Sequence, residues 1–104
     1  MPNFKDLIRL KYREDGEEKK LHIIKEASHK WKDIAGVISN DPNRISALEQ
    51  QHLGKPEDCL RQTLVDDFIN QKPEDYSHNW RGLIELLDDV DLKTLAEKIK
   101  CALS

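Results

Sequence analysis

Cysteine and glycine are scarce in this sequence, and their scarcity narrows the possible chemistry. Two cysteines and four glycines occur among 104 residues. Cys59 and Cys101 stand far apart and form no CxxC pair, so the two thiols favour a reducing compartment over a disulfide framework. With so few glycines, the chain also has no glycine-rich loop that could cradle a phosphate.

Long apolar runs are missing as well. No stretch approaches the roughly 18–20 apolar residues of a membrane span. No secretory signal with its short apolar segment opens the chain. We therefore expect a cytoplasmic protein that makes no direct membrane insertion.

Charged residues are abundant, at 36% against 38% for apolar residues. This balance predicts one compact core inside a charged shell, and the long charged side chains favour helices over strands. The net charge of −3 argues against a general nucleic-acid binder. The first 32 residues carry a net charge of +3 and the rest −6, an asymmetry that can steer the chain toward a partner or a second copy.

Residues 1–16 form an N-terminal flank in this interpretation, either a short helix or a linker. Their apolar residues fall at helical spacing, although Leu10 and Tyr12 also alternate as in a strand. Asp15–Gly16 then breaks the segment. The domain proper is expected to comprise residues 17–104.

From residue 17 onward, apolar residues step by three and four, as in amphipathic helices. We expect six short helices joined by short links, and therefore an all-α fold. Ser28 is expected to cap the second helix, Ser77 the fifth and Asp91 the sixth. The remaining boundaries are marked by Asp41, Pro42, Gly54, Pro56 and Pro73.

Five short patterns follow one another along the chain. They are Trp31–Lys32–Asp33–Ile34–Ala35, the pair Ile45 and Leu48, the leucine-rich stretch from Pro56 to Ile69, the stretch from Leu83 to Leu87, and Leu95–Ala96–Glu97–Lys98–Ile99. This ordered combination resembles the death-domain family over about residues 18–103. Two positions depart from the family pattern, since Phe68 stands where Trp is common and Ser77 replaces a Thr cap.

The resemblance implies an antiparallel six-helix Greek-key bundle that binds other death domains or copies of itself. Members of the family assemble signalling complexes in apoptotic, inflammatory or innate-immune signal transduction, often as helical oligomers. Caspase-recruitment, death-effector and pyrin domains share this fold and remain alternatives. A structural helical domain within a multidomain scaffold is a further alternative.

The residue pattern gives no indication of catalysis. The four histidines lack the short spacing of a metal site, and Cys59 has only His52 near it in sequence. Adjacent helical residues point about 100° apart, so neither Asp66–Asp67 nor Asp88–Asp89 can converge on one substrate atom. We therefore expect no enzyme activity, no cofactor and no metal.

Charged side chains supply the expected binding surfaces. The resemblance implies that a patch on the first and fourth helices meets a patch on the second and third helices of a neighbour. A nucleic-acid-binding helix pair is a rival interpretation that the negative net charge disfavours, so we expect no nucleic-acid partner. The expected partner-binding residues are Lys30, Lys32 and Arg44 on the basic side, Asp66 and Asp67 on the acidic side, and Lys55 and Glu57 in a third contact.

Overall fold

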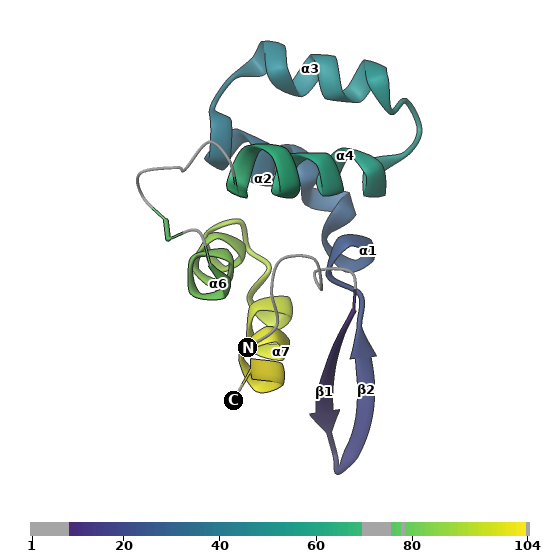
Figure 1. Cartoon of the computed structure of the whole chain (residues 1–104), viewed down its shortest axis with the longest axis vertical. Coiled ribbons are helices and arrows are strands. Elements are labelled where there is room, and N and C mark those ends of the chain that lie inside the picture. Colours follow the sequence, from purple (N-terminus) through teal and green to yellow (C-terminus); the bar gives the residue numbers. More distant parts are fainter. Residues whose placement is uncertain (1–8, 70–75, 78, 104) are drawn as a thin grey trace.

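The computed structural model describes residues 9–69, 76, 77 and 79–103 as a mostly helical chain with one β-hairpin (Figure 1). In chain order the elements are β1 Leu10–Glu14, β2 Glu17–Leu21, α1 Ile23–Ala27, the 3-10 turn η2 Ser28–Lys30, α2 Trp31–Ser39, α3 Pro42–Gln51, α4 Pro56–Gln62, the π-helical segment η3 Thr63–Phe68, α6 Trp80–Asp89 and α7 Lys93–Leu103.

The hairpin corrects the all-α expectation. β1 and β2 pair antiparallel, with Leu10 opposite Leu21. Asp15 and Gly16 have φ values of 55° and 82°, the left-handed geometry of a type I′ hairpin turn. The boundary expected between residues 16 and 17 therefore falls inside this turn. The first part of the flank, residues 1–8, lies outside the described residues.

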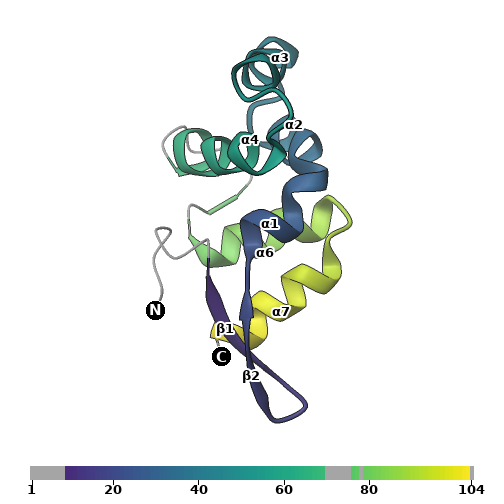
Figure 2. The same ribbon diagram turned by 90° about the vertical axis from the view of Figure 1, so that its right-hand side faces the viewer.

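The hairpin is held to the helices through one of its two faces. Side chains alternate across a strand pair, so Leu10, Tyr12 and Leu21 share a face. Leu10 and Leu21 are buried, and the Lys98 ammonium of α7 lies 5.7 Å from the centre of the Tyr12 ring. β1 packs along α7, while the turn projects away from the helices (Figure 2).

The start of α2 differs from the expected capping. The Ser28 hydroxyl donates a hydrogen bond to the Lys25 carbonyl at 3.0 Å, so it closes α1 instead of capping the next helix. A 3-10 turn follows, and α2 begins at Trp31. The expected inward positions are nevertheless confirmed, because Ala27 and Trp31 are both buried.

Two of the predicted helix starts are confirmed. The Asp41 carboxylate accepts a hydrogen bond from the Asn43 amide at 3.0 Å, with Pro42 in the first position of α3. Pro56 likewise stands at the start of α4, although no side chain among the described residues caps this helix. The helix continues into η3, where the buried Thr63 hydroxyl donates to the Cys59 carbonyl at 2.8 Å.

The caps of the last two helices lie elsewhere than expected. Asn79, and not Ser77, caps α6, since its side chain accepts a hydrogen bond from the Gly82 amide at 3.0 Å. The backbone of Ser77 instead lies so close to Gly82 that a side chain at position 82 would collide with the Ser77 backbone. Asp91 has a φ of 64° beyond the end of α6, and the Leu92 carbonyl accepts the first bond of α7. Pro73 lies outside the described residues.

The core is continuous from the hairpin through the helices. α3 lies at one end, α2 and α4 follow, and α7 with the hairpin forms the other end (Figures 1 and 2). Most residues that carry the five sequence patterns are buried in this core: Trp31, Ile34, Ala35, Leu48, Leu60, Leu64, Phe68, Leu83, Leu87, Leu95, Ala96 and Ile99. The six-helix Greek-key arrangement remains a prediction.

Candidate interaction surfaces

Arg44 and Asp67, predicted on opposite sides of a contact between copies, pair within the chain. The Arg44 Nε and Nη2 atoms donate to the two Asp67 carboxylate oxygens at 3.2 and 3.0 Å. Asp67 is only 1% exposed, whereas the Arg44 side chain is 32% exposed. The hydrogen bond to Asp67 raises the pKa of the Arg44 guanidinium above its ordinary value. This bidentate pair ties α3 to η3, so we do not assign Asp67 to a docking surface.

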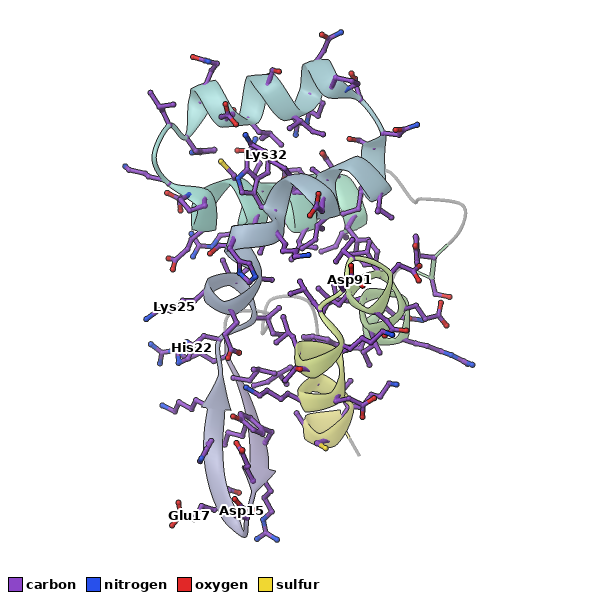
Figure 3. All side chains as sticks on the ribbon, turned by 180° about the vertical axis from the view of Figure 1, so that it is seen from behind. Asp15, Glu17, His22, Lys25, Lys32 and Asp91 are labelled. Atoms are coloured by element: carbon purple, nitrogen blue, oxygen red, sulfur yellow. The ribbon has the colours of Figure 1, made fainter. Side chains whose placement is uncertain are left out.

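Lys32 also has a partner inside the chain. Its side chain is labelled in Figure 3. The Lys32 ammonium forms an ion pair with the Glu49 carboxylate, and this pair bridges α2 and α3. Both side chains remain substantially exposed, so the pair contributes little to stability. Lys30, at the end of η2, is half-buried. Lys32 and Arg44 therefore both take part in contacts of α3 with other helical segments, Lys32 through Glu49 and Arg44 through Asp67.

Asp66, Lys55 and Glu57 remain on the surface. Asp66 is exposed while its neighbour Asp67 is buried, as the angular separation of adjacent helical residues requires. Lys55 ends the connection from α3 to α4, and Glu57 lies in the first turn of α4. These three charges are available to a partner.

Exposed apolar side chains mark the same end of the molecule. Among the described residues, the exposed large apolar side chains are Val37 on α2 at 38%, Leu53 at 70% and Val65 on η3 at 42%. Leu53 lies in the connection between α3 and α4, directly after His52. None of these three positions is among the partner-binding residues expected from charge, although Leu53 is an apolar residue next to a predicted helix end.

A shallow hollow lies beside Val65 and is bordered by charged side chains. It has a volume of about 330 Å³, and its lining includes His52, Arg61, Val65 and Asp66. The His52 Nε2 atom lies 2.5 Å from the Gln62 Oε1 atom, and this contact holds the imidazole at the edge of the hollow. We refer to His52, Leu53, Arg61, Val65 and Asp66 as the α3–α4 surface.

Cys59 lies beneath this surface in a setting unsuited to nucleophilic chemistry. Its sulfur is buried and faces the carbonyl oxygens of Leu48 and His52 at 3.6 and 3.7 Å, and not the His52 imidazole. Burial raises the pKa of the thiol, and the negative charges of Asp58 and Glu49 raise it further. The reactive thiolate is therefore disfavoured.

Metal-binding clusters and membrane-spanning helices are two further features to consider in the described part of the chain. No three histidine, cysteine, aspartate or glutamate residues there come together as a metal-binding group. None of the helices in this part has the length and apolar character needed to cross a membrane.

Comparison with known proteins returns no relative. No family model matches the chain, and no curated protein or solved structure matches it. The functional assignment therefore depends on the residue patterns and on the surfaces described above.

Proposed function

We propose that this chain is a homotypic protein–protein interaction module of the death-domain type. The observation that carries the proposal is the exposure of Leu53 and Val65 on one end of a helical domain, next to the available charges of Lys55 and Asp66. Apolar side chains rimmed by charges are typical of surfaces that dock on another protein.

The residue pattern supports the same proposal. The positions that resemble the death-domain family supply much of the core, including Trp31, Leu48 and Leu83. A family resemblance located in the core concerns the fold, while binding partners are chosen by the surface. The proposed partners are other death domains or copies of this chain, within a signalling assembly.

The proposed role is binding and not catalysis. The carboxylates of Asp66 and Asp67 diverge, and Cys59 is held as a neutral buried thiol. The two cysteines stand far apart in the sequence, with Cys59 buried and Cys101 exposed, which supports residence in a reducing compartment such as the cytoplasm.

Sedimentation velocity across a concentration series tests the proposal. We expect the wild-type chain to self-associate and the Leu53→Asp variant to associate about tenfold more weakly, because the substitution places a charge in an apolar contact. Thr94→Asp is the matched control, since it adds the same charge at an exposed position in the first turn of α7.

A second variant tests the charged rim. Asp66→Lys reverses an exposed charge and should weaken association. This loss of affinity should be larger at low salt than at high salt, because salt screens the interaction between exposed charges. Circular dichroism should remain that of the wild type for each variant. Association that is equal in the wild type, Leu53→Asp and Asp66→Lys would exclude the α3–α4 surface.

A further inference from the structure

The outward face of the hairpin concentrates positive charge. The antiparallel register places Lys11 directly opposite Lys20 and Arg13 opposite Glu18, and all four side chains are exposed. Directly opposed like charges destabilise a strand pair, so Lys11 and Lys20 carry an electrostatic cost in the isolated chain. We call Lys11, Arg13 and Lys20 the hairpin basic surface.

This surface borders a hollow. The hollow has a volume of about 440 Å³, lies where the end of α7 meets β1, and is lined by Lys11, Tyr12, Arg13, Glu18, Cys101 and Ala102. Two cationic side chains and the single carboxylate of Glu18 therefore stand beside a concave site with an aromatic wall, which leaves the site with a net positive charge. A protruding anionic side chain is the complementary shape.

The opposite charge gathers on α6. Glu85, Asp88 and Asp89 follow the i, i+3, i+4 spacing of a single helix face, and they line a hollow of about 410 Å³ with Tyr76. Asp88 and Asp89 also lie in the last turn of α6, where the helix dipole disfavours negative charge. We call these three carboxylates the α6 acidic surface. Glu85 forms an ion pair with Arg81 at 3.9 Å and Asp89 accepts a hydrogen bond from the Tyr76 hydroxyl, so the helix dipole acts against Asp88 in particular.

α7 separates the two surfaces. It packs against β1 on one side and against α6 on the other, and Figure 1 shows it between them. A chain with complementary surfaces on either side of one helix can bind a second copy while leaving one surface of each copy open. Such a head-to-tail contact continues into a ring or a filament.

We propose that the hairpin basic surface of one copy docks on the α6 acidic surface of the next. This inference rests on the proposed homotypic function and adds to it a contact made by the hairpin and α6, apart from the α3–α4 surface. The Asp88 carboxylate of one copy offsets the repulsion between Lys11 and Lys20 of the next, and these cations offset the unfavourable helix dipole at Asp88.

A second copy fits the hairpin better than a nucleic acid does. The tip of the hairpin carries Asp15 and Glu17, which Figure 3 shows at the far end of the strands, and Glu14 lies beside them. A phosphate backbone would need positive charge along the whole hairpin, and this acidic tip would repel it. A compact acidic surface on a protein contacts the basic part alone.

The Lys11→Glu variant separates docking from folding. The introduced glutamate faces Lys20 across the strands, so the melting temperature should equal or exceed that of the wild type. Self-association should nevertheless weaken by about tenfold, measured by sedimentation velocity at low salt. Lys93→Glu is the matched control, because it reverses one exposed lysine in the first turn of α7 and should leave association unchanged.

A charge-swap experiment tests the pairing of the two surfaces. Asp88→Lys should stabilise the end of α6 through the helix dipole, yet weaken self-association by about tenfold. An equimolar mixture of the Lys11→Glu and Asp88→Lys variants should associate more strongly than either variant alone. In that mixture the reversed hairpin meets the reversed α6, and the two unchanged surfaces still match.

The outcomes distinguish this inference from the proposed function. If Leu53→Asp abolishes association while Lys11→Glu and Asp88→Lys leave it unchanged, the head-to-tail contact is refuted and the α3–α4 surface stands. If the charge reversals weaken association and their mixture restores it while Leu53→Asp has no effect, the head-to-tail contact stands and the α3–α4 surface is refuted. A monomeric wild type that binds duplex DNA through Lys11 would refute both.

Discussion

Replacing Arg44 with alanine tests whether the bidentate pair with Asp67 holds α3 on η3. The substitution leaves the Asp67 carboxylate, which is 1% exposed, without its two hydrogen bonds at 3.0 and 3.2 Å. Breaking a buried ion pair by removing one partner typically costs 3–5 kcal/mol, and the partial exposure of Arg44 places this case near the lower end, at about 3 kcal/mol. That loss is a large part of the ~5–15 kcal/mol stability of a typical domain.

Arg61→Ala is the matched control for this prediction. Arg61 forms an ion pair with Asp58 at the same 3.0 Å separation, but its side chain is 46% exposed. An exposed pair of this kind contributes about 0.5 kcal/mol. Distance alone therefore predicts equal effects for the two variants, whereas burial predicts a difference of about 2.5 kcal/mol.

Urea unfolding followed by tryptophan fluorescence measures this difference, because Trp31 and Trp80 are both buried in the folded chain. The double variant Arg44→Met/Asp67→Leu should recover most of the loss, since it removes both charges and supplies apolar side chains. Equal free energies of unfolding for Arg44→Ala and Arg61→Ala would refute the reasoning.

Three further predictions concern other parts of the structure. Gly82→Ala should lower the melting temperature strongly, because the added methyl group collides with backbone, whereas Gly36→Ala meets open space on α2 and should gain about 0.5–1 kcal/mol. A maleimide should label the exposed Cys101 rapidly and the buried Cys59, whose pKa is raised, slowly at neutral pH. The stability contributed by the neutral Cys59 thiol is fully present below the pKa of this thiol in the unfolded chain, and it is lost as pH rises through the raised pKa of the folded chain. Leu21→Ala should cost about 2–5 kcal/mol in chemical denaturation if the hairpin belongs to the core, and near zero if it does not.

The sequence allowed much of the helical part of the fold to be predicted. Asp41 with Pro42 and the proline at position 56 are local signals, because a cap and a missing amide act within one helical turn. The apolar spacing around Trp31 likewise identifies the buried face of α2.

The hairpin could not be predicted from the sequence pattern, for a physical reason. Its second strand, Glu17–Leu21, has one apolar residue and no β-branched residue, so no alternating pattern is visible. Burial of Leu21 and Leu10 against the helices supplies the stability that local preference lacks. The Asp15–Gly16 dipeptide is compatible both with a break and with a hairpin turn, and the structure shows the turn.

The binding residues were only partly predictable from charge. Arg44 and Asp67 lie 23 positions apart, and only the packing of α3 on η3 shows that they neutralise each other. The exposure of Leu53 depends in the same way on where the connection between α3 and α4 runs. Surface composition can be read from a sequence, but pairing across the fold cannot.

The sedimentation coefficient of the wild-type chain as a function of concentration tests the central claim most directly. A homotypic interaction module should sediment faster as concentration rises, and Leu53→Asp should shift that rise to higher concentration. A single species of 12.1 kDa at every concentration, unchanged by low salt, would contradict the claim.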